Sequence, residues 1–298
     1  MFQFLEVYKF LLFSSFLNSK ERGYDDLSTV GILATGGPDG GGSGARVLIE
    51  KILNGEFAEV NKLVLITNYT KGGVAKIFEK YKDQLQEIDV NLELKIVKNF
   101  PKRGENGEFT PEDDQWIRDT YQEILTTYGL DYLHCSGWMK HILGLSPSIS
   151  QNIHPGPTKE PYGGLGMHGD NVHELVWEDY QKGIINQSCV TMHFVIEELD
   201  RGPISVQIPV SIASCKSADD VGSEVNKTEH KYQYIVYKML LEGKITWSGN
   251  KEDPVQIDKD ELEKYDFPEG TVFGGEVELN KWAGLAEAEM NAWLDGEE

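Results

Sequence analysis

Short apolar runs alternate with amphipathic stretches through the first half of the chain. The stretches at 45–55 and 71–85 place apolar residues four positions apart, as on one face of a helix. The runs between and around them have the length of single strands, and they lie at 29–35, 62–68, 91–97 and 131–137. Strands that alternate with helices predict a parallel sheet whose two faces are both covered by helices.

The stretch at 110–129 carries the clearest helix boundaries. Thr110 stands at the position of an N-cap, and Pro111 follows at the first helical position. Acidic residues fill the first turn, where they favour the positive end of the helix dipole, and Gly129 ends the pattern. We therefore expect a helix of about five turns between the third and fourth strands.

The pattern changes from residue 151 onward. A loop rich in Gly, Pro and His at 155–169 precedes a predicted helix at 171–181. Two apolar strands then follow within 187–210, joined by a turn that contains Asp200, Gly202 and Pro203. The next amphipathic stretch, at 221–245, is long enough for a helix of six to seven turns.

Both ends of the chain differ from this α/β pattern. The apolar stretch at 1–28 lacks a basic start and a clear cleavage site, so we expect a helical extension that docks on the body or on a second copy in a homodimer; a targeting segment is the alternative. Residues 250–298 form an acidic extension. From 251 to 298 there are 4 Lys and Arg against 15 Asp and Glu, which gives 4 − 15 = −11.

The net charge of −21 narrows the classes of partner. Nucleic acids and anionic membranes both favour basic surfaces, so we expect neither as a partner. The three cysteines show no C-x-x-C spacing and no His clustering accompanies them, which favours reduced thiols, a cytoplasmic location and no metal site. We expect small-molecule substrates instead.

The glycine-rich segment TGGPDGGGSGAR, at 35–46, connects the first strand with the first helix. Backbone N–H groups at such a helix start can hold a phosphate, because glycines let the anion approach closely. The segment lacks a clean G-x-G-x-x-G and the G-K-[ST] of a P-loop, so neither a nicotinamide nor an ATP site is indicated. A flexible turn without a ligand is the alternative.

Three polar residues are candidates for proton handling. Asn152 and His154 are two apart on an extended segment, so their side chains project from the same face. An amide donor beside an imidazole suits the stabilisation of an oxyanion. Asp200 would orient that imidazole, although its own stretch taken alone slightly favours a turn aspartate that binds local N–H groups. No G-x-S-x-G segment suggests a covalent nucleophile.

Taken in order, these motifs resemble the glycinamide ribonucleotide (phosphoribosylglycinamide) formyltransferase family. NIHPG, GGLGMHGDNVHE and VTMHFVIEELDRGPISVQIPV resemble its catalytic half, and GILATGGPDGGGSGA and VLITN resemble its nucleotide-binding half. The resemblance covers about 29–249 and implies one Rossmann-like formyltransferase domain, with a phosphate-binding half at 29–150 and a catalytic, folate-binding half at 151–249. The first loop is longer than in the family, and Lys140 stands where many members have arginine.

The resemblance also implies a reaction and its residues. The formyl group of 10-formyltetrahydrofolate would pass to the amine of glycinamide ribonucleotide, in purine biosynthesis and without a metal. Asn152 and His154 would stabilise the oxyanion, Asp200 would relay a proton, and Glu229 would bind the amino end of the substrate. The ribose phosphate would lie on Gly42, Ser43, Gly44, Ala45 and Arg46. Folate would lie on Met139, Lys140, Ile142, Leu143, Val195, Ile196 and Leu199.

Two other activities fit the same motifs. A formyltransferase that uses another amine, such as a sugar amine, would share the three catalytic residues but not the phosphate loop. A 10-formyltetrahydrofolate hydrolase would use water as the acceptor. Residues 1–28 are too few for the regulatory domain that the hydrolases generally carry, and the acidic charge argues against a tRNA acceptor. A binding protein without catalysis is the remaining alternative.

Overall fold

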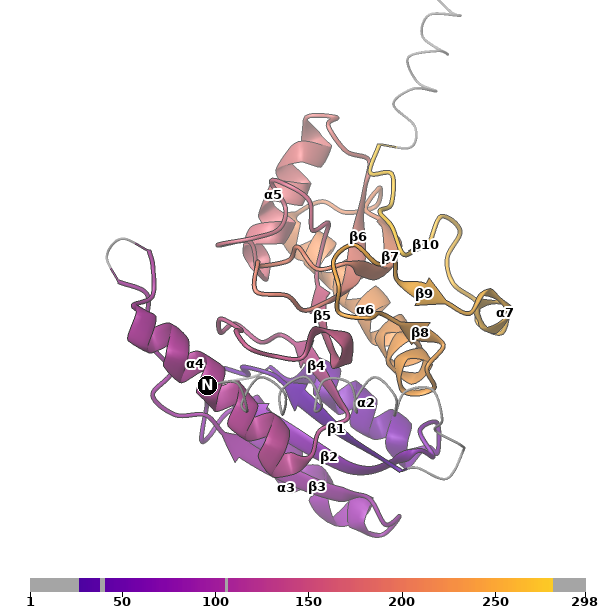
Figure 1. Cartoon of the computed structure of the whole chain (residues 1–298). Coiled ribbons are helices and arrows are strands. Elements are labelled where there is room, and N and C mark those ends of the chain that lie inside the picture. The colour runs from indigo at the N-terminus through magenta and orange to yellow at the C-terminus, as the bar shows by residue number, and fades with distance from the viewer. Residues whose placement is uncertain (1–26, 38–40, 105–106, 281–298) are drawn as a thin grey trace, which may run out of the picture.

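The computed structural model describes residues 27–37, 41–104 and 107–280. The predicted extension at 1–28 lies almost wholly outside these ranges, and so does the end of the acidic extension after residue 280. An eight-stranded sheet runs through both halves of the described chain in the order β10-β7-β6-β5-β4-β1-β2-β3 (Figure 1). The α/β architecture with a mostly parallel sheet and helices on both faces is therefore confirmed.

The first half of the fold follows the predicted alternation. Its elements are β1 (Ser28–Leu33), α2 (Ser43–Leu53), β2 (Val60–Thr67), α3 (Gly73–Gln86), β3 (Asn91–Ile96), α4 (Pro111–Tyr128) and β4 (Tyr132–Ser136). Strand β1 pairs in parallel with both β2 and β4, which places the loops after β1 and β4 side by side. Thr110 caps α4 in a full capping box with Asp113, as its position in the sequence predicts.

The second half changes strand direction at β5. Its elements are η1 (Pro147–Ile149), β5 (Ser150–His154), α5 (Asp170–Gln181), β6 (Gln187–Phe194), β7 (Ile204–Ser211) and α6 (Ala218–Leu241). Strand β5 is parallel to β4 but antiparallel to β6, and β6 is antiparallel to β7. Helix α6 begins three residues earlier than predicted, because Ser217 caps it by accepting from the Asp220 backbone N–H.

Two buried clusters cover the two faces of the sheet. One joins apolar residues of α2, α3, α5 and α6 to the strands, and the other joins α4 to β1, β2 and β4. Helix α6 contacts both α2 and α5 on the first face. The loops at the carboxyl ends of the central strands β1, β4 and β5 lie where a ligand site is expected in such a fold.

The C-terminal segment up to residue 280 belongs to the same body. It contains β8 (Ile245–Thr246), β9 (Gln256–Ile257), α7 (Lys259–Leu262) and β10 (Val272–Phe273), and it lies beside β7 in Figure 1. Strand β10 pairs with β7, and Gln207 accepts from the Val277 backbone N–H at 2.5 Å. Sequence alone predicted only an acidic extension here, because the two-residue strands show no periodicity.

Candidate active site

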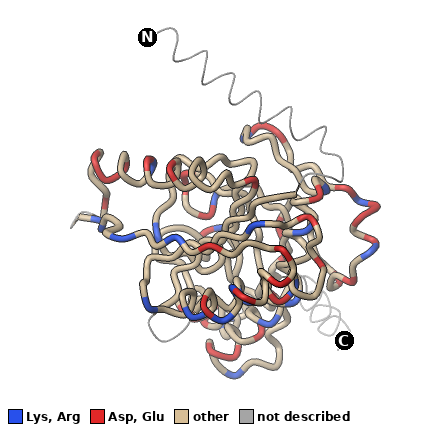
Figure 2. Tube along the Cα trace, turned by 90° about the horizontal axis from the view of Figure 1, so that it is seen from below, with Lys and Arg blue, Asp and Glu red and all other residues tan. Residues whose placement is uncertain are grey.

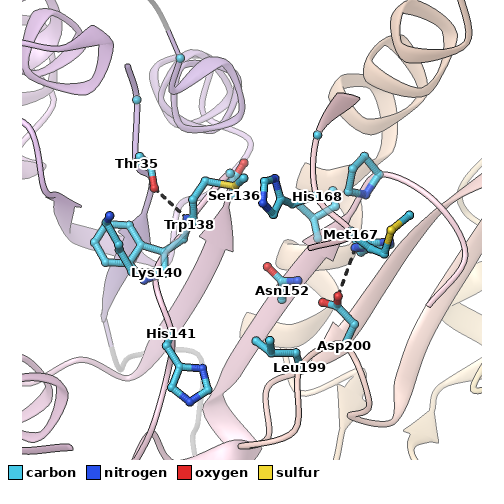
Figure 3. A pocket seen from close by; sticks show the side chains of 18 of the residues that line it. Thr35, Ser136, Trp138, Lys140, His141, Asn152, Met167, His168, Leu199 and Asp200 are labelled. Carbon is cyan, nitrogen blue, oxygen red and sulfur yellow. Dashed lines mark hydrogen bonds and ion pairs between the residues drawn. The ribbon is translucent and has the colours of Figure 1, made fainter. Parts of the chain in front are cut away.

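A cavity of about 880 Å³ opens at the carboxyl ends of β1, β4 and β5. Its walls come from the glycine loop at 35–37 and 41–44, the segments 100–103 and 136–141, the end of β5, the loop at 164–169 and one face of α6. Figure 3 shows Thr35, Trp138 and Lys140 on one side of this cavity and Asn152, Leu199 and Asp200 on the other. The cavity therefore contains candidates from both halves of the chain.

Asn152 and His154 line the cavity from the last residues of strand β5. His154 is 3% exposed, and its Nε2 donates to the carbonyl of Tyr162 at 3.0 Å, because a carbonyl can only accept. Nδ1 of the same ring lies 3.6 Å from Oδ2 of Asp200. Burial lowers the pKa of His154, although the Asp200 charge opposes this, so the neutral ring is favoured before a ligand binds.

Asp200 adopts a left-handed backbone, with φ 56°, in the turn between β6 and β7. Its Oδ2 accepts from the Gly164 backbone N–H at 2.9 Å, and its Oδ1 lies 3.5 Å from His193 Nε2. Burial disfavours the charged carboxylate, but the His193 side chain, His154 and the Gly164 N–H outweigh it and hold the pKa of Asp200 at about 2. The residue is therefore both a turn residue and an ionised group in the cavity.

Gly202 lets the turn pass close to strand β6. A Cβ at this position would lie 1.7 Å from the backbone oxygen of Phe194, so no other residue fits without moving the strand. The turn that carries Asp200 is consequently packed directly against the backbone of β6.

His193 also belongs to this group, although the sequence analysis did not name it as a candidate. It is directly opposite Asn152 in the pairing of β5 with β6, and its Nε2 is 3.1 Å from Asn152 Nδ2. Its Nδ1 donates to the Phe194 carbonyl at 3.0 Å. The register of the two strands supplies this contact. A residue on a separate strand gives no sequence signal of its own for such a pairing.

The glycine loop leads directly into the start of α2. Gly42 has φ 80°, and α2 begins at Ser43 without a side-chain cap, so its first N–H groups face the cavity mouth. Gly42, Ser43 and Gly44 line the cavity. Ala45 is fully buried, and Arg46 pairs with Glu50 at 3.1 Å, so neither side chain is among the lining residues.

Glu229 lines the same cavity from α6. Burial raises the pKa of this carboxyl to about 7, and no counter-charge offsets that effect. The next residues on this face of α6, Gln233 and Tyr237, are almost fully buried and have polar side-chain atoms without protein partners. Glu229 therefore lies at the outer end of a buried polar row.

The residues that the resemblance assigned to folate line two cavities. Met139, Lys140 and Leu199 line the cavity with Asp200. The others line a neighbouring cavity of about 610 Å³, and they are Ile142, Leu143, Val195 and Ile196. Two ion pairs lie at this second cavity: Arg118 with Glu197, and Lys251 with Glu198, the latter at 2.7 Å. The second cavity thus includes Lys251, beyond the segment that the resemblance covers.

The described residues include no group of three or more His, Cys, Asp or Glu side chains placed to hold a metal ion. Among the helices of the described ranges, none has the length and apolarity needed to cross a membrane. Acidic and basic positions are interspersed along the described trace in Figure 2. Any anionic ligand must therefore meet local donors in the cavity rather than an extended basic surface.

Comparisons with known proteins point in one direction. No family model matches the chain. A chloroplastic phosphoribosylglycinamide formyltransferase of Arabidopsis thaliana is 30% identical over 139 residues, which is 45% of each chain. The Escherichia coli phosphoribosylglycinamide formyltransferase is 25% identical over 196 residues, covering 62% of this chain and 81% of that protein. The chain spans about half the length of the plant relatives it matches.

Solved structures show the same fold. Glycinamide ribonucleotide transformylase 1 of Symbiobacterium toebii aligns with a TM-score of 0.57 and 18% identity, over 80% of this chain and 98% of that chain. The Coxiella burnetii phosphoribosylglycinamide formyltransferase aligns with a TM-score of 0.56 over 78% and 94%. In sequence the chain is similar to curated phosphoribosylglycinamide formyltransferases, and its fold is that of the solved glycinamide ribonucleotide transformylases.

Proposed function

We propose that the protein transfers the formyl group of 10-formyltetrahydrofolate to the amine of glycinamide ribonucleotide. The observation that carries this proposal is the shared cavity, in which Asn152, His154 and Asp200 lie together with the uncapped start of α2. A phosphorylated amine bound at Gly42–Gly44 would place its nitrogen toward the three polar side chains. The similarity to formyltransferases supports the same assignment.

The proposed chemistry begins with attack of the neutral amine on the formyl carbon. A carbon–nitrogen bond forms, the carbonyl electrons move to oxygen, and the nitrogen becomes positive. Asn152 Nδ2 would leave its contact with His193 and donate to the new oxyanion. Such a donor to an oxyanion typically stabilises the transition state by about 3–4 kcal/mol. Collapse of the tetrahedral intermediate then breaks the bond to N10 of the folate, which takes up a proton as it leaves.

His154 and Asp200 would move the proton lost by the attacking nitrogen. The resemblance to formyltransferases implies a protonated His154 beside the oxyanion, whereas burial favours the neutral ring in the ligand-free cavity. A negative oxygen that forms beside the ring raises the pKa of the imidazole, so His154 would gain its charge during the reaction. Asp200 stays ionised over the working pH range, and it would stabilise the imidazolium that forms and accept the proton through a water molecule.

The remaining cavity residues would place the substrates. Glu229 would accept from the amino end of the nucleotide, and the start of α2 would hold the phosphate through backbone N–H groups. The pterin ring would extend from Leu199 toward the second cavity, where Ile142 and Val195 supply apolar walls. Lys140 at the rim would face the anionic part of the folate.

Deformylation of 10-formyltetrahydrofolate, measured with and without glycinamide ribonucleotide, tests this proposal. We expect turnover only when the nucleotide is present, with one formylated product per folate released. Turnover with water alone would instead indicate a hydrolase, and turnover with a sugar amine but not with the nucleotide would indicate the other formyltransferase activity. An inactive protein that remains folded by circular dichroism would overturn all three.

A further inference from the structure

Arg201, the residue after Asp200, makes contacts that the proposed reaction does not use. Its guanidinium donates to the Thr158 carbonyl, to Glu160 and, at 3.3 Å, to the Gly163 carbonyl. All three partners belong to the loop at 158–164, which follows the last residues of β5. One side chain on the β6–β7 turn therefore forms several hydrogen bonds to a loop from a different part of the sequence.

Asp200 and Arg201 hold this loop with opposite polarity. The Asp200 carboxylate accepts from the Gly164 backbone N–H, whereas Arg201 donates to backbone carbonyls on the other side of the same turn. The loop is tightly folded, because a Cβ at Gly163 would lie 2.3 Å from the Thr158 carbonyl oxygen. The planar guanidinium suits such a convergent set of acceptors better than a single ammonium does.

The loop at 158–164 also contacts the catalytic candidate His154. The Tyr162 carbonyl, between Glu160 and Gly163, accepts from His154 Nε2 at 3.0 Å. The Tyr162 ring has its own anchor, since its hydroxyl donates to Asp179 at 2.7 Å. That bond holds the ring but does not set the direction of the Tyr162 carbonyl. The carbonyl is positioned through the next peptide, whose oxygen belongs to Gly163 and accepts from Arg201.

We propose that Arg201 is a positioning residue: its hydrogen bonds to the loop at 158–164 keep the Tyr162 carbonyl on His154 Nε2. The proton of the neutral imidazole then stays on Nε2, and the unprotonated Nδ1 faces Asp200. Without these hydrogen bonds, the ring can place its proton on Nδ1 toward Asp200 Oδ2, which is already 3.6 Å away. Nε2 then becomes an acceptor. This role rests on the proposed function for its catalytic consequence, but the tautomer itself is a property of the protein without substrates.

The test compares Arg201→Ala and Arg201→Lys with the unchanged protein by ¹⁵N NMR of labelled histidine at pH 8. Loss of the signal in His154→Gln assigns the resonances. We expect one Nε2–H tautomer in the unchanged protein, a shift toward Nδ1–H in Arg201→Ala, and an intermediate state in Arg201→Lys, which can reach only part of the acceptor set. Glu160 is largely exposed, so Glu160→Gln should give a smaller change than Arg201→Ala.

Lys82→Ala, which removes one positive charge at an exposed pair on α3, is the matched control. It should leave the His154 signals unchanged. With both substrates, Arg201→Ala should lower kcat by about tenfold to a hundredfold while KM changes less than threefold, because misplacement of a reacting group mainly affects the chemical step. An unchanged tautomer in both Arg201 variants overturns the proposal even if kcat falls. Absence of transfer by the unchanged protein overturns the proposed function but leaves the tautomer result to decide the role of Arg201.

Discussion

Two carboxylates line the same cavity from different elements, and their surroundings give them opposite protonation behaviour. On the β6–β7 turn, His193, His154 and a backbone N–H surround Asp200 and hold its pKa at about 2 despite burial. On α6, burial without a counter-charge raises the pKa of Glu229 to about 7. The difference comes from the neighbours of each group, since both are carboxylic acids with similar ordinary values.

This contrast separates a permanently ionised group from one that changes its charge with its ligand. Asp200 is charged with or without substrate, so it can stabilise a protonated imidazole at any working pH. Glu229 is close to half-protonated near pH 7, and a nearby positive nitrogen would lower its pKa and favour the anion. The proposed site thus has a fixed charge where the proton is handled and an adjustable one where an amine is recognised.

The largest effect is expected from Asp200→Asn. The amide keeps the size of the side chain and tolerates the left-handed backbone, but it removes the fixed charge. Turnover should fall by about 10²- to 10⁴-fold. Steady-state kinetics with circular dichroism as a folding check measures this, and Asp83→Asn on the exposed side of α3 is the control. Near-normal turnover would show that Asp200 serves only the turn.

A somewhat smaller loss of turnover is expected from Asn152→Ala, on the same side of the cavity as Asp200. The variant removes an oxyanion donor, which typically costs about 10²- to 10³-fold in kcat, and it leaves the charge of Asp200 in place. The comparison of kcat with KM decides the outcome, since a transition-state donor should change kcat much more than KM. A rise in KM alone would assign Asn152 to substrate binding.

Glu229→Gln should change binding rather than chemistry, and only where Glu229 is ionised. At pH 8 the variant should raise KM for the nucleotide by about tenfold, the size of one lost hydrogen bond to a charged group. At pH 6, where the native carboxyl is mostly neutral, the difference should nearly disappear. An equal increase in KM at both pH values would contradict a raised pKa for Glu229.

The two carboxylates should also give opposite slopes of stability against pH. The folded pKa of Asp200 lies below its ordinary 3.8, so its contribution is present above pH 4 and is lost as pH falls toward about 2. The folded pKa of Glu229 lies above its ordinary 4.5, so its contribution is lost as pH rises from 4.5 through about 7.

Urea unfolding at pH 5 and pH 8 tests the second slope. Relative to Glu229→Gln, the native chain should lose stability between these values, by at most about 3 kcal/mol. Parallel pH dependence of the two proteins would mean that Glu229 titrates normally and that its pKa does not differ from that of Asp200 in the way described.

The smallest effect is expected from Ser217→Ala, which removes the N-cap of α6 far from Glu229. Loss of such a cap typically costs about 1 kcal/mol of unfolding free energy. Both carboxylates should keep their pKa values, and kcat should stay within twofold. A changed pH profile would show that the Glu229 environment depends on the stability of the whole helix rather than on local burial.

Sequence alone predicted the parallel half of the sheet well, because each strand there is a continuous apolar run between clear helices. It also brought Asn152, His154 and Asp200 forward as candidates through their spacing and turn chemistry. His193 was not among the candidates, because its contact with Asn152 comes from the register of β5 against β6. The pairing of β10 with β7 was missed for a similar reason, since a two-residue strand is defined by its partner and not by its own pattern.

The left-handed backbone at Asp200 limits which changes this position can accept over evolutionary time or in a design experiment. With φ at 56°, glycine and asparagine fit with little strain, whereas a longer acid such as glutamate would have to pay the conformational penalty while also moving the carboxylate outward. Gly202 blocks compensation from the neighbouring backbone. A search for variants with a displaced carboxylate should therefore begin at positions other than 200.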